Sequence, residues 1–368
     1  MGESTDVFVI GGGPAGLVAA IAARKQGFRV TVADADEPPI DKACGEGLLP
    51  NSLEALARLG ISLTPSDGYP FRGIRFVDGG VAPEAHFPGA PGRGVRRKAL
   101  HGIIVSHASS CGVRLLWRTR VTGFDDETVF LGGTRIDTRW IIGADGANSL
   151  VRRWARLDGR VQDEVRFAHR RHYRLHLWTD CVEVHWGDRM QVYVTPVGPN
   201  EICAAVISRN PRMRLADALR SLPALAARLE NGAPSSAERG GITCMLELRS
   251  VCRGRVALTG DAAGCVDAIT GEGLGLAFQQ AEALAEALAT SDLRAYEAAH
   301  RQIGRRASLM AKSLLVLDSW PALRQRVMRT FENHPPVFDR LLAAHVGNGS
   351  DANLVASGVR LAWHIVTA

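Results

Sequence analysis

Glycine-rich clusters, widely separated along the chain, offer residue types that can hold a phosphorylated dinucleotide. The first matches G-x-G-x-x-G and comprises Gly11, Gly13, Pro14, Ala15 and Gly16. A diphosphate needs close approach to free backbone N–H groups at a helix N-terminus, and glycines leave room for that approach. Asp34 follows 18 residues after Gly16, where a carboxylate can accept hydrogen bonds from ribose hydroxyls. The alternative is a glycine turn that only packs a helix on a strand.

The elements around this turn must form a βαβ unit if the turn is to bind a diphosphate. Residues 6–10 read as a short buried strand, 17–26 as an Ala-rich helix that Gly27 ends, and 28–33 as a second strand. The uncharged run 7–23 is not expected to be a signal peptide or a membrane span. Its glycines and Pro14 interrupt it, and no basic segment precedes it.

The remaining pattern predicts an α/β protein with a Rossmann-like domain, an interleaved strand-rich layer and C-terminal helices. The expected strands are 113–122, 127–131, 138–142 and 255–258, with an antiparallel set over 165–208. The expected helices begin near residue 97 and cover 211–231, 273–289 and most of 292–330. Residues 80–94 read as irregular because of their prolines and glycines.

Two later clusters combine glycine with aspartate at the ends of expected strands. They are Asp145-Gly146 and Gly260-Asp261. Either one alone could be an ordinary turn. The segment Gly271-Glu272-Gly273-Leu274 then opens a helix whose free N–H groups can stabilise negative charge.

Taken in this order, the clusters resemble those of the para-hydroxybenzoate hydroxylase-like flavoproteins. That family includes single-component aromatic hydroxylases, geranylgeranyl reductases and flavin-dependent halogenases. The resemblance implies bound FAD, with Asp145 and Gly146 beside the diphosphate and Asp261 at the ribityl or ribose hydroxyls. It places the helix from Gly273 against the pyrimidine edge of the flavin. Ala268 stands where the family usually has a proline.

Two further segments carry the resemblance. Arg97 is similar to an arginine that reaches the FAD diphosphate from a helix start, although Arg96 or a plain surface role are alternatives. Residues 42–48 resemble the Cys-Gly segment of the geranylgeranyl reductase branch, beside the isoalloxazine ring. Gly45 and Gly47 would let this loop lie on the flat ring. The catalytic candidates are Cys44 and Glu46, and the alternative for Cys44 is a buried inert thiol. Val121 completes the expected cofactor-binding set.

With FAD as the cofactor, the expected domains are discontinuous. The FAD-binding domain comprises residues 1–75, 95–165 and 250–310, and the substrate domain comprises 76–94 and 166–249. A C-terminal helical segment covers 311–368. Within the substrate domain, several aromatic and imidazole side chains could line a pocket, although packing in the core is the commoner fate of such residues. They are Trp186, Tyr193, Pro196, His169, His172, His176 and His185.

The flavin sets the repertoire of reactions. The leading hypothesis is an NAD(P)H-dependent monooxygenase that hydroxylates a small organic or aromatic, polyketide-like substrate. The alternatives are a geranylgeranyl-reductase-like enzyme that reduces isoprenoid double bonds, and a non-catalytic FAD-binding or membrane-surface protein. A halogenase is disfavoured because the chain has no Trp-x-Trp-x-Ile-Pro. A long apolar pocket beside the flavin would favour prenyl reduction, and a compact polar one would favour hydroxylation.

Composition limits the partners. The net charge is +6, but the arginines are scattered rather than gathered in a stripe, so no nucleic-acid partner is expected. The odd number of seven cysteines, with no CxxC pair, predicts reduced thiols in the cytoplasm and no metal site. No obligate protein partner is evident. Residues 309–329 mix apolar and basic side chains, which predicts either peripheral membrane contact or packing against the FAD-binding domain.

Overall fold

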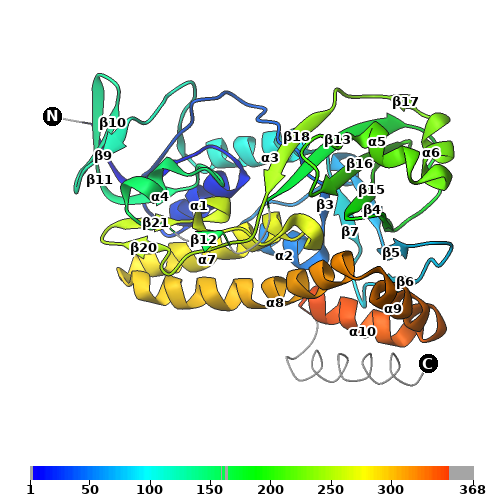
Figure 1. Cartoon of the computed structure of the whole chain (residues 1–368). Helices are drawn as coiled ribbons and strands as arrows, with labels where there is room; N and C mark the ends of the chain where they lie inside the picture. Colours follow the sequence, from blue (N-terminus) through cyan, green and yellow to red (C-terminus); the bar gives the residue numbers. More distant parts are fainter. Residues whose placement is uncertain (1–2, 159, 162–164, 348–368) are drawn as a thin grey trace.

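The expected βαβ unit opens the computed structural model, which describes residues 3–158, 160–161 and 165–347 (Figure 1). β1 (Glu3–Ile10) leads through the glycine turn into α1 (Pro14–Lys25), and β2 (Val30–Ala33) returns parallel to β1. Pro14 suits the first helical turn because its missing N–H would have no helical partner there. Gly27 has a φ of 89°, the left-handed conformation with which helices commonly end.

The first sheet brings the carboxyl ends of five parallel strands to one edge. Its path runs β20 (Cys252–Arg253), β21 (Val256–Leu258), β11 (Thr134–Gly143), β1, β2 and β8 (Arg114–Leu116). β10 (Thr128–Leu131) pairs with β11, and β9 (Gly123–Phe124) pairs with β10. The register pairs Ile10 with Ala33 and with Gly143, and pairs Gly143 with Leu258. Because the Gly11 turn, Asp34, Asp145 and Asp261 follow the ends of β1, β2, β11 and β21, the register brings these clusters together.

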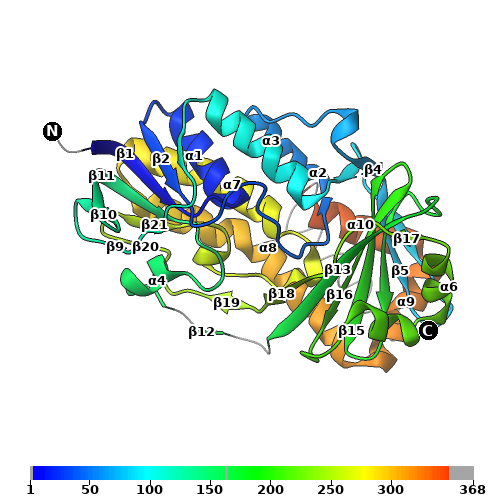
Figure 2. The same ribbon diagram turned by 90° about the horizontal axis from the view of Figure 1, so that it is seen from above.

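The second sheet is the strand-rich layer expected from the sequence, and it lies beside the first (Figure 2). It is antiparallel except where β5 pairs parallel with β14. In order its strands are β17 (Ala233–Pro234), β13 (Arg166–Arg174), β16 (Glu201–Ser208), β15 (Met190–Gly198), β14 (Val182–Trp186), β5 (Gly73–Val77) and β6 (Glu84–His86), with β18 (Arg239–Thr243) on β13.

Smaller pairings complete the strands. A three-stranded sheet joins β3 (Gly47–Leu48), β7 (Gly92–Gly94) and β4 (Tyr69–Phe71), and β12 (Arg160–Val161) pairs with β19 (Leu246–Glu247). The expectation that residues 80–94 are irregular is therefore wrong at β6 and β7. The prolines in that stretch, such as Pro83 and Pro88, lie outside the two strands, where no ladder hydrogen bond is needed.

The helices begin at prolines more often than the sequence pattern alone indicated. After α1, the described α-helices are α2 (Pro50–Arg58), α3 (Arg97–Ser110), α4 (Leu150–Trp154), α5 (Leu215–Arg220), α6 (Pro223–Glu230), α7 (Gly273–Thr290), α8 (Leu293–Ser319), α9 (Pro321–Asn333) and α10 (Pro335–His345). The helix expected over 211–231 is split because Pro223 cannot continue the backbone ladder. Pro321 and Pro335 start new helices for the same reason.

α8 connects the two layers along the lower edge of the molecule in Figure 1, and α9 and α10 lie beneath the second sheet. Ala311 of α8 and Val327 and Phe331 of α9 belong to one buried cluster with Phe76 of β5 and Phe338 of α10. The inner face of 309–329 therefore packs against the second sheet. It also meets the expected FAD-binding domain, because Leu49 and Ile269 belong to the same cluster. Among the described helices, none combines the length and the apolar character that crossing a membrane requires.

Candidate functional site

The glycine turn after β1 is shaped for close approach to backbone. Gly11 has a φ of 114°, and a Cβ there would lie 2.4 Å from the carbonyl oxygen of Ala144. A Cβ at Gly16 would lie 1.9 Å from the carbonyl oxygen of Gly11, so Gly16 lets α1 pack on the turn. At Gly13 the space around an added Cβ is open, and no side chain caps the N-terminus of α1. This helix end can therefore accept a diphosphate.

Asp34, at the end of β2, faces the same turn. Its Oδ2 accepts a hydrogen bond from the Gly12 N–H at 2.6 Å, and its Oδ1 accepts one from the Asp36 N–H at 2.8 Å. His101 of α3 braces the turn from the other side, because its Nε2 lies 2.8 Å from the Gly12 carbonyl oxygen. Burial lowers the pKa of His101, which keeps the imidazole neutral and its Nε2 a donor to that carbonyl.

The two neighbouring arginines have different surroundings. Arg97 lines the cavity, is buried, and has an Nε without a hydrogen-bond partner. Arg96 turns toward the second sheet, where its Nη1 lies 3.3 Å from Oε1 of Glu201. Of the two, Arg97 is thus the one placed to meet an anion in the cavity.

Glu46 is held inside a buried polar network. Its Oε1 accepts a hydrogen bond from the Arg97 N–H at 2.9 Å, and its Oε2 lies 2.6 Å from Nε2 of His172. Arg170 adds a cation, with Nη2 3.7 Å from Oε1. Glu46 has a φ of 61°, an uncommon backbone conformation for a residue other than glycine. These contacts fix the 42–48 loop, and a catalytic role for Glu46 stays a prediction.

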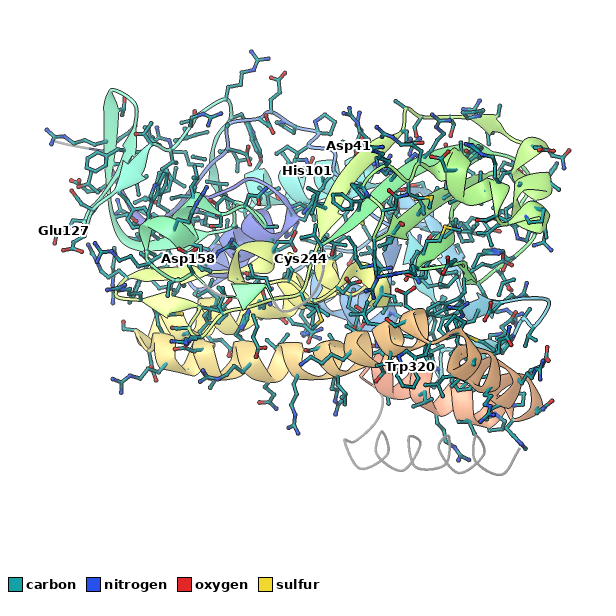
Figure 3. All side chains as sticks on the ribbon, viewed as in Figure 1. Asp41, His101, Glu127, Asp158, Cys244 and Trp320 are labelled. Atoms are coloured by element: carbon teal, nitrogen blue, oxygen red, sulfur yellow. The ribbon has the colours of Figure 1, made fainter. Side chains whose placement is uncertain are left out.

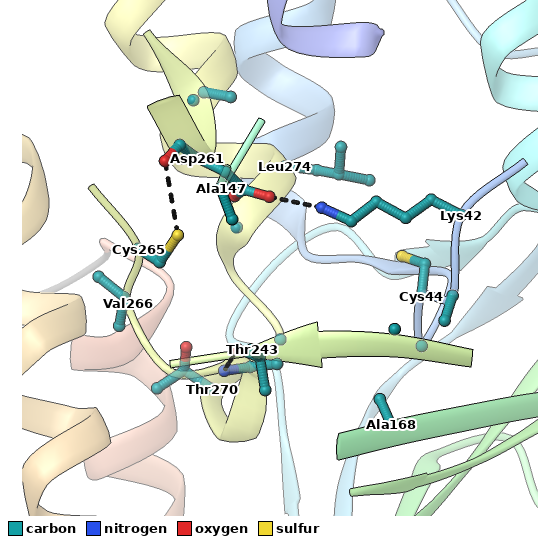
Figure 4. A pocket seen from close by; sticks show the side chains of 18 of the residues that line it. Lys42, Cys44, Ala147, Ala168, Thr243, Asp261, Cys265, Val266, Thr270 and Leu274 are labelled. Carbon is teal, nitrogen blue, oxygen red and sulfur yellow. Dashed lines mark hydrogen bonds and ion pairs between the residues drawn. The ribbon is translucent and has the colours of Figure 1, made fainter. Parts of the chain in front are cut away.

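Lys42 and Asp261 join two clusters that are 219 residues apart (Figure 4). The Lys42 Nζ lies 2.6 Å from Oδ2 of Asp261, and the Cys265 thiol donates to the Asp261 carbonyl oxygen at 3.5 Å. Burial opposes the charge on Lys42, but Asp261 outweighs that effect and the pKa of Lys42 is raised. Burial raises the pKa of Cys265 to about 12, so this thiol stays protonated.

Asp145 has a local structural task. Its Oδ2 accepts a hydrogen bond from the Leu150 N–H at 2.7 Å, and its Oδ1 accepts one from the Ser149 hydroxyl. Ser149 in turn caps α4 by accepting from the Arg152 N–H at 2.9 Å. The Asp-Gly cluster therefore shapes the turn that borders the cavity.

The N-terminus of α7 lies on the same cavity through Gly271, Gly273 and Leu274. Gly271 has a φ of 70°, and no side chain caps the helix. Glu272 points elsewhere, because its buried carboxylate lies 3.5 Å from Nδ1 of His345 in α10. Burial raises the pKa of Glu272. The free N–H groups of this helix can therefore stabilise negative charge in the cavity.

One continuous cavity of about 970 Å³ joins all these segments. All the residues expected to bind the cofactor or to act in catalysis line it, apart from Gly16 and Glu272. We call the part lined by the Gly11–Gly13 turn, Asp34, Asp145, Asp261 and Gly273 the glycine end. Cys44, Gly45, Gly47 and Val121 also line the cavity.

The remainder, the apolar end, lies between the second sheet and the C-terminal helices. Its lining consists almost entirely of hydrocarbon side chains: Phe71, Ile74, Phe76, Val182, Val184, Ala205, Ile207, Leu309, Met310, Leu314, Leu317, Val327, Phe331, Phe338, Leu341 and Leu342. Tyr193, Thr195, Ser313 and His345 are polar side chains that line it, and Arg170 of β13 and Thr243 of β18 also line the cavity from the second sheet. Tyr193 donates its hydroxyl to the carbonyl oxygen of Ile269 at 2.8 Å.

Sequence reasoning found Tyr193 but missed most of the apolar end. Among the described lining residues, Trp186, Pro196 and the four histidines expected as pocket candidates do not occur. Trp186 packs edge-on against Phe76, and His185 lies 2.9 Å from Oε2 of Glu183. The apolar end instead draws on α8, α9 and α10. Their apolar periodicity was visible in the sequence, but periodicity cannot distinguish a core face from a cavity wall.

The glycine end fits FAD on its own geometry. The uncapped helix end beside Gly13 and the unpartnered Nε of Arg97 suit a diphosphate. The carboxylates of Asp34 and Asp261 suit sugar and ribityl hydroxyls, and the uncapped start of α7 suits the electron-rich edge of a flavin.

A family model described as FAD binding domain matches residues 4–187. The chain is 30% identical to the menaquinone reductase of Mycobacterium tuberculosis, over 79% of this chain and 78% of that protein. It is 29% identical to the para-nitrophenol 4-monooxygenase of a Pseudomonas strain, over 77% of each chain. A digeranylgeranylglycerophospholipid reductase of Methanosarcina mazei is 28% identical over 43% of this chain and 42% of its own.

Among solved structures, a flavoprotein/dehydrogenase from Cytophaga hutchinsonii superposes with a TM-score of 0.84 over 99% of both chains. Its sequence is 19% identical, so the likeness concerns the fold.

Proposed function

Because this chain belongs to the family of FAD-dependent oxidoreductases that share this FAD binding domain, we propose that it reduces a carbon–carbon double bond in an isoprenoid lipid. The expected resemblance to flavoprotein hydroxylases and reductases is confirmed. The observation that carries the proposal is the apolar end of the cavity, which opens directly onto the glycine end.

The polarity of the apolar end matches a hydrocarbon chain. Small aromatic substrates with hydroxyl or carboxyl groups need fixed polar partners, since a buried polar group without a hydrogen bond is costly. Here the Tyr193 hydroxyl already donates to a carbonyl oxygen, and the C-terminal helices contribute mainly Leu, Val and Phe. An extended prenyl chain can be bound by burial of its apolar surface against such a lining.

The relatives support the same choice. Two of the three named above are reductases, and their names refer to lipids, menaquinone and digeranylgeranylglycerophospholipid. The Lys-Ala-Cys-Gly-Glu-Gly-Leu loop, which resembles the geranylgeranyl reductase branch, lies where the two ends of the cavity meet. The sequence alone favoured hydroxylation, whereas the apolar lining of the cavity supports reduction.

Residues of the 42–48 loop would position the reactants and supply a proton beside the flavin. Bound FAD supplies two-electron chemistry. Gly45 and Gly47 keep the loop close to the cavity without side chains in the way, and the Glu46 contacts hold the loop in place. Cys44 lines the cavity, and its Sγ accepts a hydrogen bond from the Glu46 N–H at 3.3 Å. We assign the Cys44 thiol as the proton donor to the second carbon of the reduced bond.

The electron donor and the location belong to the same proposal. NADH or NADPH would reduce the flavin transiently. A cytoplasmic site of action agrees with the seven free cysteines.

Anaerobic turnover tests the proposal. The FAD-loaded protein is given NADPH or NADH, or dithionite as a donor of electrons, together with a prenylated lipid in detergent. We expect a product with one double bond fewer, detected by mass spectrometry. No saturated product with any of the three donors would contradict the proposed reaction.

The second candidate is an NAD(P)H-dependent monooxygenase. It is favoured by the para-nitrophenol 4-monooxygenase relative, which matches this chain over a similar length to the menaquinone reductase. A hydroxylated product and substrate-dependent oxygen uptake in air would establish it. A saturated product without oxygen would exclude it.

A further inference from the structure

The outer face of α8 carries an unusual set of exposed side chains. Among the described residues, seven large apolar side chains are exposed, and three of them lie between Leu309 and Trp320. Leu309 is 54% exposed, Val316 48% and Trp320 65%. Such a concentration on one helix differs from the isolated exposed leucines that are ordinary on protein surfaces.

These side chains form one stripe with basic residues between them. At 3.6 residues per turn, positions separated by three or four residues share a helix face. The α8 stripe, as we define it, comprises Arg305, Leu309, Lys312, Val316 and Trp320. The opposite face, with Ala307, Ala311 and Asp318, is buried.

The charge around the α8 stripe has one sign. From residue 298 to residue 331 the sequence has seven Lys and Arg side chains, of which Arg324 is buried against Asp78, and a single acid, Asp318. Asp318 is buried and bound to Gln191 and Arg209, so it does not offset the cations at the surface. Exposed Arg326 and Arg329 of α9 extend the basic surroundings.

The stripe borders the mouth of the cavity. Met310, Leu314 and Leu317 lie on the flank of α8 that lines the apolar end. Leu309 both lines the cavity and is more than half exposed, so it belongs to the cavity wall and to the outer stripe. Trp320 ends the stripe at the junction of α8 and α9, in the lower right of Figure 3.

We propose that the α8 stripe docks on an anionic lipid bilayer and that the apolar substrate enters from the bilayer past Leu309. Leu309, Val316 and Trp320 would enter the headgroup region, where tryptophan is favoured and lysine and arginine extend their charges to lipid phosphates. This inference rests on the proposed function for the chemistry of the substrate, but the docking itself requires no turnover.

Vesicle sedimentation tests the docking with the full FAD-loaded protein. We expect binding to phosphatidylcholine vesicles that contain phosphatidylglycerol, weaker binding to phosphatidylcholine alone, and release at high salt. The double variant Val316→Gln/Trp320→Gln and the double variant Arg305→Glu/Lys312→Glu should each bind at least about tenfold more weakly. Neither pair includes a residue that lines the cavity.

A matched control separates a specific surface from net charge. Arg135→Glu/Arg212→Glu changes the charge by the same amount at exposed positions on β11 and after β16, and it should bind vesicles like the parent. Equal binding by all variants, or no binding by the parent, would overturn the proposal. So would concentration-dependent self-association that is lost in Val316→Gln/Trp320→Gln, because the stripe would then be a protein interface.

The two proposals can fail separately. A protein that binds anionic vesicles yet saturates no prenyl lipid keeps the docking surface and loses the proposed reaction. A protein that reduces a prenyl lipid in detergent yet ignores vesicles keeps the reaction and loses the docking surface.

Discussion

The two ends of the cavity differ in which groups line them: mainly backbone at the glycine end and side chains at the apolar end. The glycine end is made of backbone N–H groups, missing Cβ atoms and a few carboxylates at strand ends. The apolar end is made of large side chains from a sheet and three helices. A site made of backbone tolerates few substitutions, whereas a hydrocarbon wall can be built from many combinations of Leu, Val, Ile and Phe.

The glycine turn should show the largest effect. Gly16→Ala places a methyl group against the Gly11 carbonyl oxygen and should lower the free energy of unfolding by about 3 kcal/mol. Gly13→Ala meets open space, so it should leave unfolding unchanged while weakening FAD binding about tenfold, or about 1.4 kcal/mol. Urea unfolding and FAD titration measure the two quantities. Equal unfolding curves for both variants would show that close packing at Gly16 is not required.

Cys44, where the two ends meet, should come next. Cys44→Ala removes the assigned proton donor and should lower the rate of double-bond reduction about a hundredfold. FAD content and the rate of flavin reduction by the donor should not change. Stopped-flow absorbance and product analysis distinguish the two steps, and Cys203→Ala, at a buried thiol behind the loop, is the control. An unchanged rate of double-bond reduction in Cys44→Ala would show that another group donates the proton.

A smaller effect is expected at the apolar end. Leu314→Trp fills part of the cavity from α8 and should lower kcat/KM for a long prenyl substrate about tenfold, with FAD affinity unchanged. The decrease in kcat/KM should be smaller for a substrate with a single prenyl unit. Gln302→Trp, on the exposed side of the same helix, is the matched control. A fall in FAD affinity instead would show that the two ends are not separable.

The smallest expected effect is the pH dependence of protein stability that His101 contributes at the glycine end. The folded protein binds a proton on His101 less readily than the unfolded chain, because burial lowers the pKa of this imidazole. Its contribution to stability is therefore complete above about pH 6.5, the ordinary imidazole value, and is lost as the pH falls below it. Thermal unfolding from pH 7.5 to 5 should show a steeper loss in the parent than in His101→Asn. Parallel curves would exclude His101 as a source of the slope.

The same contrast explains what could be predicted from the sequence. Gly11, Gly13, Asp34 and Asp261 stand at strand ends, and parallel strands bring such ends to one edge, so motif order was enough to expect one site. The roles of these residues toward FAD remain predictions.

The apolar end left no comparable signal. Leu314 and Phe338 satisfy the same periodicity whether they fill a core or line a cavity. Lys42 was also overlooked as a partner of Asp261, because an ion pair across 219 residues has no local pattern. The histidines near β13 and β14 suggested a pocket, but His172 contacts Glu46 and His185 contacts Glu183 instead.

The interleaved order of the strands has a consequence for folding during synthesis. β5 finds its parallel partner β14 more than a hundred residues later, and β18 adds the last strand of the second sheet by Thr243. β21, Asp261 and α7 all follow that point. A growing chain can therefore complete the second sheet before the cofactor cradle is finished, and long-range pairings of this kind fold slowly. Capture of FAD must wait for the last third of the protein. A fragment that ends before residue 256 would contain every strand of the second sheet but lack part of the cradle and the helices α8–α10 that pack on that sheet.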